Sequence, residues 1–302
     1  MVIKNQEDET HKERRKRKIR NHIVYNDWDL STHLQMFRKT VGNTSMKHAI
    51  QLVAHRGGSH LAPQNTLAAF RNELNFPIDA IELDVHMSRD GHAIVFHDYT
   101  VEKLTNGAGN ILDLDFDYLR SLNAAAHFPG WPEAQQIPML SEVLNLARGR
   151  VQVYIEIKPS KRDGVFGQYP NIVETVVEEI RAAAMLDQVL IISFDWQVLP
   201  RIKALEPALL TGALVSTDVW NPREKQALSR LAERVAALGC EWINMDCRLF
   251  SSEMPGVFHQ NGFKLGVWTV NSLREMRRFV NAGVDSLTSD RPDLFTGLRA
   301  FL

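Results

Sequence analysis

The 302-residue sequence has little cysteine and no long uncharged apolar run. Its two cysteines, Cys240 and Cys247, are too few for a disulfide framework and match no metal-ligand spacing, which favours a reducing compartment. Nowhere do about 18 uncharged apolar residues follow one another, and residues 1–20 contain no apolar core of a signal peptide. We therefore expect a cytoplasmic protein with no transmembrane segment.

The sequence also has almost no net charge. A formal charge of −1 at pH 7 gives no whole-molecule reason to expect nucleic acid or an anionic membrane as partner. Residues 1–45 nevertheless hold ten of the 35 basic and six of the 36 acidic residues, with the run HKERRKRKIR at their centre. Such a run can bind nucleic acid or lipid head groups, but we favour a solvated extension, disordered or partly helical. Whether Met46 is the working start stays open, as does the oligomeric state.

Short apolar, β-rich runs alternate with amphipathic helical patterns such as NIVETVVEEIRAAAML from residue 50 onward. This alternation is typical of parallel βα units, and about 250 residues is the usual size of an eight-stranded βα barrel. We therefore predict one α/β domain over residues 46–302, a TIM (β/α)8 barrel, in preference to two domains. The nine candidate strands are residues 51–54, 80–85, 93–96, 151–157, 189–194, 209–215, 242–245, 264–270 and 284–288.

Two regions do not fit a regular barrel. Nine strands are one too many, and only the eight residues HMSRDGHA separate ELDV from IVFH. A parallel crossover usually needs about a dozen residues or more, so either this unit has lost its helix or the two strands are antiparallel. We favour a lost helix and parallel strands, since both strand ends then lie at the same rim. Residues 99–138 lack a long periodic pattern and are predicted to form a lid-like insertion over the C-terminal rim.

Polar side chains occupy the C-terminal ends of several candidate strands. Residues i and i+2 of a strand share a face, so Glu82 and Asp84 point the same way, as do Glu156 and Lys158. Barrel enzymes keep their active sites at this end of the strands. The side chains expected at the same rim from the other strands are His55, Arg56, His97 and Trp268.

The residue types at this rim indicate phosphate chemistry. Three carboxylates, Glu82, Asp84 and Glu156, would raise one another's pKa unless a cation lies among them. Oxygen ligands suit a hard ion, Mg²⁺ or Ca²⁺, better than Zn²⁺. One such divalent cation together with Arg56 and Lys158 would make an electropositive pocket for a phosphate, and two histidines beside it can supply a base and an acid for breaking a phosphodiester.

Eight short motifs, in order along the chain, resemble the glycerophosphodiester phosphodiesterase family. The resemblance covers about residues 51–295 and implies an eight-stranded βα barrel with a bound divalent cation. It also implies hydrolysis of glycerophosphodiesters, small diester substrates, to sn-glycerol 3-phosphate and an alcohol. The motifs are HRG at 55–57, P-x-N-T at 63–66, ELDV at 82–85, the DG to VFHD stretch at 90–98, EIK at 156–158, SFD at 193–195, VWTVN at 267–271 and GVD to TSDRPD at 283–293.

Carried onto this chain, the resemblance assigns a role to each rim residue. His55 and His97 match the catalytic pair, and which of them is the base stays open, as does attack by water or by the neighbouring glycerol hydroxyl. Trp268 is a further candidate for substrate contact. The remaining matches are Glu82, Asp84 and Glu156 as metal ligands, and Arg56 and Lys158 as phosphate-binding residues.

Several nearby residues receive a lesser role or depart from the family pattern. Asp98 is not expected to orient His97, because adjacent residues of a strand face opposite ways. Gln64 stands where the family usually has glutamate, and Lys103 where arginine is common. Both departures bear on the alcohol or head group rather than on the metal. Three further histidines are expected to be structural or solvent-facing, namely His60, His86 and His92.

Two other functions compete with this interpretation. A lysophospholipase D of the same barrel type would cleave substrates that keep an acyl chain, and an exposed apolar groove beside the insertion would favour it. A closed polar pocket would favour small glycerophosphodiesters. A non-catalytic binding barrel is the third candidate, although it would not need histidines, carboxylates and a lysine together. The head group and the choice between Mg²⁺ and Ca²⁺ are not fixed by the sequence.

Overall fold

The computed structural model describes residues 50–302. The predicted basic extension, residues 1–45, and the candidate start at Met46 lie outside the described residues. Among the helices that are described, none is both long enough and apolar enough to cross a membrane.

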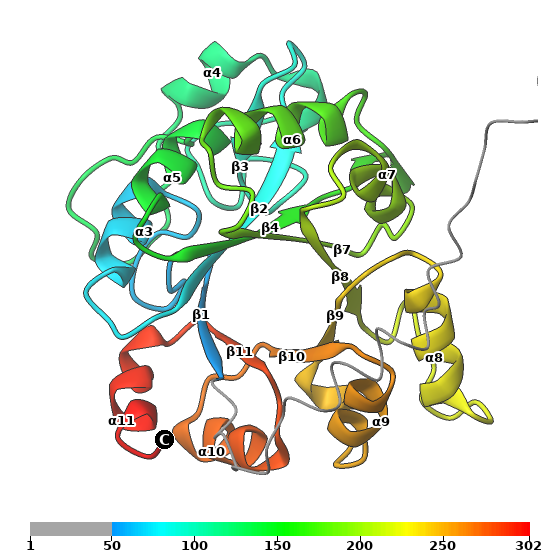
Figure 1. The fold of residues 1–302 in the computed structure, drawn as a ribbon. Helices are drawn as coiled ribbons and strands as arrows, with labels where there is room; N and C mark the ends of the chain where they lie inside the picture. The colour runs from blue at the N-terminus through cyan, green and yellow to red at the C-terminus, as the bar shows by residue number, and fades with distance from the viewer. Residues whose placement is uncertain (1–49) are drawn as a thin grey trace, which may run out of the picture. The chain divides into compact units, whose positions relative to one another are not determined.

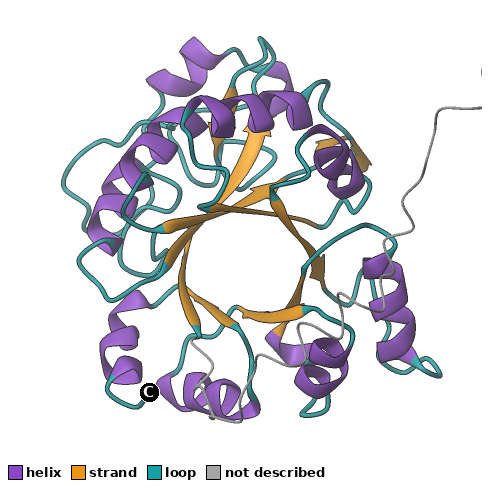
Figure 2. Cartoon of the chain, viewed as in Figure 1, coloured by secondary structure: helices purple, strands orange, loops and turns teal. Residues whose placement is uncertain are grey.

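Within residues 50–302, eight parallel strands close into a barrel (Figures 1 and 2). Their order around the ring is β1-β11-β10-β9-β8-β7-β4-β2, and the pairing of β1 with β2 closes it. The predicted TIM (β/α)8 barrel is therefore confirmed. The barrel strands are β1 (Gln51–His55), β2 (Ala80–Met87), β4 (Gln152–Ile157), β7 (Val189–Ser193), β8 (Leu210–Val215), β9 (Trp242–Asp246), β10 (Lys264–Trp268) and β11 (Ser286–Ser289).

Helices lie outside this ring of strands, as Figure 2 shows. Three short 3₁₀ helices, η1 (Ile111–Asp113), η2 (Cys247–Leu249) and η3 (Pro292–Leu294), accompany them in the described part of the chain. The α-helices described are α3 (Leu67–Glu73), α4 (Phe116–Ser121), α5 (Leu140–Ala147), α6 (Ile172–Ala182), α7 (Val198–Leu205), α8 (Ala227–Ala236), α9 (Met254–Gln260), α10 (Leu273–Ala282) and α11 (Phe295–Arg299).

Capping residues in the sequence set the ends of the helices that follow active-site strands. Helix α3 begins after Thr66, whose Oγ1 accepts a hydrogen bond from the Ala69 amide at 3.2 Å. Helix α10 begins after Ser272, whose Oγ accepts from the Glu275 amide at 3.3 Å. Its C-cap is Gly283, which has a φ of +86° that favours glycine. These caps fix where the chain leaves each strand end, and so they fix the βα loops at the rim.

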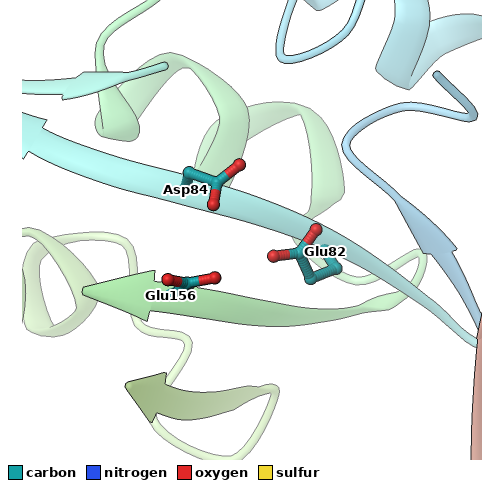
Figure 3. Close-up of side chains that lie close together, drawn as sticks. All are labelled: Glu82, Asp84 and Glu156. Atoms are coloured by element: carbon teal, nitrogen blue, oxygen red, sulfur yellow. The ribbon is translucent and has the colours of Figure 1, made fainter. Parts of the chain in front are cut away.

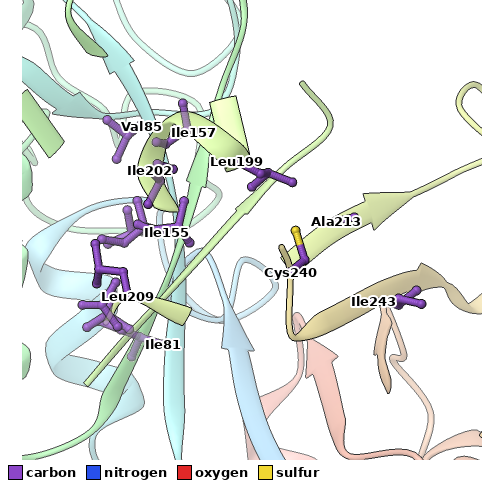
Figure 4. Close-up of a cluster of buried hydrophobic side chains, with 14 of the residues drawn as sticks. Ile81, Val85, Ile155, Ile157, Leu199, Ile202, Leu209, Ala213, Cys240 and Ile243 are labelled. Carbon is purple, nitrogen blue, oxygen red and sulfur yellow. The ribbon is translucent and has the colours of Figure 1, made fainter. Parts of the chain in front are cut away.

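The alternation of side chains along β2 separates the core from the site. Ile81, Leu83 and Val85 belong to the large hydrophobic cluster between strands and helices, whereas Glu82 and Asp84 belong to the opposite face. Figure 4 shows part of this cluster, to which β2, β4 and α7 all contribute side chains. Each fully buried large apolar side chain contributes about 1.5–3 kcal/mol, so the outward faces hold the barrel together while the inward faces are free to carry polar groups.

One of the nine predicted strands, β3 (Ala93–Val95), does not belong to the parallel barrel. It is antiparallel to β2, so the predicted parallel arrangement is wrong. Eight residues are too few for a crossover, so the chain makes a hairpin in which the Ser88 amide bonds the His92 carbonyl at 3.0 Å. Strand β2 extends to Met87, and β3 returns alongside it until the Phe96 amide reaches the Asp84 carbonyl, 3.0 Å away. The antiparallel return thus brings the chain back toward the carboxylates just before His97.

Residues 99–138 and a small hairpin are additions to the barrel. The 99–138 segment contains η1 and α4 and contributes to a separate buried cluster. Strands β5 (Ser160–Arg162) and β6 (Val165–Gly167) form an antiparallel hairpin just after β4, which the sequence pattern did not predict. The cluster comprises Ile94, Phe96, Val101, Ile111, Leu119, Leu122, Ala124 and Ile137.

Candidate active site

A cavity of about 210 Å³ lies where the predicted rim residues meet. Seven of the eight predicted site residues line it, and the eighth, Asp84, is fully buried beside Glu82 and Glu156. Among the described residues, none of the predicted lid-like insertion, residues 99–138, is part of the lining, so a lid function stays a prediction. The lining residues are His55, Arg56, Glu82, His97, Tyr154, Glu156, Lys158, Ile192, Phe194, Leu214, Asn244, Trp268, Thr269 and Thr288.

Glu82, Asp84 and Glu156 converge from two neighbouring strands (Figure 3). Asp84 of β2 pairs directly with Glu156 of β4 in the parallel register, and Glu82 lies two residues earlier on the same face of β2. One carboxylate oxygen from each side chain lies within 4.8 Å of the other two, and all three side chains are buried. The strand register therefore produces the compact acidic cluster that the sequence predicted.

Crowding and burial shift the pKa of each carboxyl in this cluster. Burial raises the pKa of Glu82 well above its usual range, and the neighbouring Asp84 charge raises it further. Burial also raises the pKa of Glu156 above its ordinary value, against the opposing effect of Lys158. Burial acts in the same direction on Asp84, but Arg56 and Lys158 outweigh it and hold the pKa of Asp84 well below its usual range. Burial and crowding therefore disfavour the ionised forms of Glu82 and Glu156 unless a cation lies among them.

The donor set fits a divalent cation. Asp84 Oδ1 and Glu156 Oε1 are buried, and both face Lys158 Nζ, which lies 3.4 Å from the first and 2.8 Å from the second. Asn65 Nδ2 donates to the other oxygen of Asp84 at 2.9 Å and fixes that carboxylate. Buried acceptors that are all oxygen are the ligands that Mg²⁺ and Ca²⁺ prefer. Glu82, Asp84 and Glu156 can therefore hold one such ion.

Arg56 and Lys158 place two positive charges beside the carboxylates. The Arg56 backbone amide donates to Glu82 Oε2 at 3.2 Å, its Nε lies 3.2 Å from Asp84 Oδ2, and its Nη1 donates to Gln64 Oε1 at 3.1 Å. Arg56 has a φ of +53°, a conformation that is costly for a residue with a side chain and common at functional sites. Burial lowers the pKa of the Lys158 ammonium, but Glu156 and Asp84 together raise it above its ordinary value. Both cations stay charged at neutral pH.

His55 contacts a carboxylate that follows the last strand of the barrel, β11. Asp290 Oδ1 lies 2.6 Å from His55 Nδ1, and Asp290 also accepts hydrogen bonds from Ser59 Oγ and Asn271 Nδ2. The other ring nitrogen, Nε2, lies 3.8 Å from Glu82 Oε2. Burial, followed by the Arg56 charge, lowers the pKa of His55, and Asp290 opposes this. Sequence reasoning gave Asp290 no role, although it lies in the TSDRPD motif that contributed to the family resemblance.

His97 is oriented in the same way by its own neighbour. Asp98 Oδ1 lies 2.5 Å from His97 Nδ1, so the expectation that Asp98 does not orient His97 is wrong. Strand β3 ends at Val95, and the alternation of faces therefore does not extend to residues 97 and 98. In both histidines Nδ1 contacts a carboxylate, which leaves Nε2 for the reaction.

His86 supports the backbone at His97. Its Nε2 donates to the His97 carbonyl at 3.0 Å, which leaves Nδ1 to accept from the Tyr169 hydroxyl at 2.9 Å. Burial lowers the pKa of His86 to about 3, so the ring is neutral with its single N–H on Nε2. This arrangement agrees with the structural role expected of His86.

The remaining wall of the cavity is largely apolar. The Trp268 ring meets Phe194 edge to face with 5.6 Å between ring centroids, and its Nε1 donates to the Asn244 carbonyl at 2.9 Å. Ile192 and Leu214 complete the apolar part of the lining. Trp268 therefore packs in the wall and also presents one surface to the cavity.

Comparisons with known proteins agree with this arrangement. A profile of the glycerophosphoryl diester phosphodiesterase family matches residues 55–294. A glycerophosphodiester phosphodiesterase of Caldanaerobacter subterraneus is 33% identical over 250 residues, which cover 82% of this chain and 96% of that protein. One from Bacillus subtilis is 28% identical over 268 residues, 84% of this chain and 88% of that one. The structure of an Oleispira antarctica phosphodiesterase in complex with the product sn-glycerol-3-phosphate superposes with a TM-score of 0.70 at 26% identity and covers 82% of this chain and 96% of that one.

Proposed function

Because the chain belongs to the glycerophosphoryl diester phosphodiesterase family, we propose that it cleaves glycerophosphodiesters at the cavity lined by seven of the eight predicted residues. It is a phosphoric diester hydrolase whose activity yields glycerol 3-phosphate. The observation that carries the proposed mechanism is the acidic cluster, whose carboxylate oxygens lie within 4.8 Å of one another at a cavity lined by two carboxylate-bound histidines.

The substrate phosphate is bound by positive charge on one side of the cavity. Glu82, Asp84 and Glu156 would hold a divalent cation, which when bound supplies Lewis-acid stabilisation of the phosphoryl oxygens. Arg56 and Lys158 donate to the same non-bridging oxygens and stabilise the charge that develops on them in the transition state. Because Asp84 Oδ1 and Glu156 Oε1 already face Lys158, the lysine links the acidic cluster to the phosphate.

His55 and His97 form an acid–base pair across the phosphorus. The Nε2 of one ring takes the proton from the attacking oxygen as that oxygen bonds to phosphorus. The Nε2 of the other ring gives a proton to the leaving alkoxide as its bond to phosphorus breaks. The attacking oxygen belongs to water, or to the neighbouring glycerol hydroxyl with hydrolysis of the resulting cyclic phosphate in a second step. Asp290 and Asp98 keep each Nδ1 engaged so that each Nε2 faces the reaction.

The size of the cavity favours small substrates over acylated lysophospholipids. A volume of about 210 Å³ is below the roughly 300–1,000 Å³ typical of sites that enclose a drug-sized ligand. It holds a phosphate with a short polyol, whereas an acyl chain would need an apolar groove leading away from the cavity. Trp268 and the apolar wall beside it then contact the carbon atoms of the polyol.

The test is release of glycerol 3-phosphate from glycerophosphocholine with and without a chelator. We expect chelation to abolish release and Mg²⁺ or Ca²⁺ to restore it. His55→Ala is expected to lower kcat by about 100-fold or more, while His60→Ala, which removes an exposed imidazole outside the cavity lining, is the matched control and keeps full activity. Turnover that needs no metal, or full activity of His55→Ala, would contradict the mechanism.

A further inference from the structure

Asn244 presents an amide inside the cavity that no part of the proposed mechanism uses. Asn244 lies on β9 and lines the cavity, yet only 4% of the residue is exposed to solvent. Its Nδ2 is buried and has no hydrogen-bond partner among the described residues. Leaving a buried donor unpaired is unfavourable, so a ligand that accepts a hydrogen bond from it is bound more tightly.

Two glycines on the neighbouring strands make room for this amide. A Cβ at Gly212 of β8 would lie 2.5 Å from Asn244 Nδ2, and a Cβ at Gly266 of β10 would lie 2.4 Å from Asn244 Oδ1. Both distances are shorter than two non-bonded atoms tolerate. The amide therefore occupies space that side chains at Gly212 and Gly266 would otherwise fill.

In the order of strands around the barrel, the strand that carries Asn244 is opposite the strands that carry the charged groups. The cations and carboxylates come from β1, β2 and β4, whereas Asn244 comes from β9. Its neighbours in the lining include the apolar side chains Leu214 and Trp268. Trp268 Nε1 donates a hydrogen bond to the backbone carbonyl of Asn244 at 2.9 Å, so the side-chain amide of Asn244 is not involved in this contact. A phosphate bound on the charged side thus directs its polyol substituent toward a wall that offers one buried amide among apolar groups.

We propose that the Asn244 amide binds the terminal hydroxyl of the glycerol unit and so selects glycerophosphodiesters in which that hydroxyl is free. The inference rests on the function proposed above. The secondary hydroxyl is adjacent to the ester-bearing carbon and stays near phosphorus, whereas the terminal hydroxyl is one carbon further away and reaches the far wall. An amide can donate or accept, and therefore suits a hydroxyl in either role. An acyl group on the same oxygen would meet the buried amide and the strands that enclose it.

A deoxy substrate measures this contact directly. Wild-type protein and Asn244→Leu, which keeps side-chain bulk but removes the amide, are assayed on glycerophosphocholine and on propane-1,2-diol phosphocholine, which lacks only the terminal hydroxyl. We expect the wild type to favour glycerophosphocholine in kcat/KM by about 10- to 100-fold. Asn244→Leu should lose about that factor on glycerophosphocholine and change little on the deoxy substrate.

Two further variants separate the contact from general damage to the barrel. Thr211→Val removes a fully buried hydroxyl from β8 outside the cavity lining and should keep the wild-type preference. Asn244→Ser keeps a smaller hydrogen-bonding group and should retain part of the preference. Thermal unfolding of each variant reports whether it folds. A folded Asn244→Leu that keeps the preference, or loses activity equally on both substrates, overturns the role of Asn244.

A third substrate tests the selection against acyl chains. Wild-type protein should cleave 1-acyl lysophosphatidylcholine at least about 100-fold less efficiently than glycerophosphocholine. Comparable efficiency on the two would overturn the exclusion. Failure of the wild type to release glycerol 3-phosphate from glycerophosphocholine would overturn the proposed function itself, and with it the role of Asn244. The two kinds of failure are therefore read from different measurements.

Discussion

His55 and Asp290 are 235 positions apart in the sequence, yet His55 Nδ1 and Asp290 Oδ1 are 2.6 Å apart in the folded chain. The contact joins the first strand of the barrel to the loop after the last. His97 and Asp98 repeat it between sequence neighbours at 2.5 Å. In both imidazoles, therefore, Nδ1 contacts a carboxylate and Nε2 stays available to act as acid or base.

Removing either carboxylate should impair the reaction without affecting metal binding. Asp290→Asn and Asp98→Asn are each expected to lower kcat by roughly 10- to 1,000-fold, because the imidazole loses the partner that fixes its orientation and tautomer. Asp293→Asn removes a carboxylate that pairs with Arg291, and is the matched control with little effect. Steady-state kinetics give kcat, and calorimetric titration gives the metal affinity. A fall in metal affinity as large as the fall in kcat would contradict an orienting role.

Glu82→Gln should affect stability and function in opposite directions. Burial and the Asp84 charge raise the pKa of Glu82, so its ionised form is unfavourable in the metal-free fold. The variant is expected to gain roughly 1 kcal/mol or more in free energy of unfolding at pH 8 in the presence of chelator. Its affinity for Mg²⁺ or Ca²⁺ should fall at least about tenfold, and activity should be lost with it. Urea unfolding with and without metal measures both effects, and a metal-free variant less stable than the wild type would contradict the crowding.

Glu73 should make stability depend on pH although it is no part of the site. Its carboxyl on α3 is fully buried, neither oxygen has a hydrogen-bond partner among the described residues, and burial raises its pKa well above the ordinary value. The folded state then binds more protons than the unfolded state between the two pKa values, so stability falls as pH rises through that window.

Glu73→Gln removes this pH dependence. We expect the variant to be more stable than the wild type by roughly 1–3 kcal/mol at pH 8 and nearly equal to it at pH 4, in urea unfolding at each pH. Glu133→Gln makes the same change at an exposed position and is the control, with no difference expected at either pH. A variant less stable than the wild type at pH 8 would show that the Glu73 charge is compensated.

Gly57 and Gly91 form a matched pair for testing the turn after β1. Both have positive φ values, +86° and +90°, which strain any residue with a side chain by about 1–3 kcal/mol. A Cβ on Gly57 would also lie 2.4 Å from the Cβ of Ala69, whereas a Cβ on Gly91 would meet no atom within 4 Å. Gly57→Ala should therefore be less stable than Gly91→Ala by roughly 1–3 kcal/mol in urea unfolding. Equal losses would mean that α3 can move away from the turn.

The sequence predicted the barrel and the carboxylate cluster because both follow from alternation along strands. Glu82 and Asp84 interrupt an apolar run at positions two apart, and a parallel register then places Glu156 opposite Asp84. The same reasoning does not extend beyond a strand's end. It wrongly made β3 parallel and turned Asp98 away from His97, because both depend on where the hairpin places the chain after Val95.

Long-range partners that carry no local pattern were also missed. Asp290 appeared only as part of a motif, and its contact with His55 depends on the closure of the barrel between β1 and β11. Asn244 sits in an ordinary apolar strand, and what marks it is the pair of glycines on strands that become its neighbours only after folding. The roles of such residues can be recognised only once the order and pairing of the strands are known.

The most direct test of the metal site is anomalous diffraction from crystals grown with Mn²⁺ and glycerol 3-phosphate. The mechanism predicts one anomalous peak with carboxylate oxygens of Glu82, Asp84 and Glu156 about 2.0–2.6 Å from it, and with a phosphate oxygen in the same shell. Asp84→Asn crystals treated alike should show a weaker peak or none. An active wild-type enzyme whose ion lies elsewhere, or whose three carboxylates do not contact it, would contradict the account.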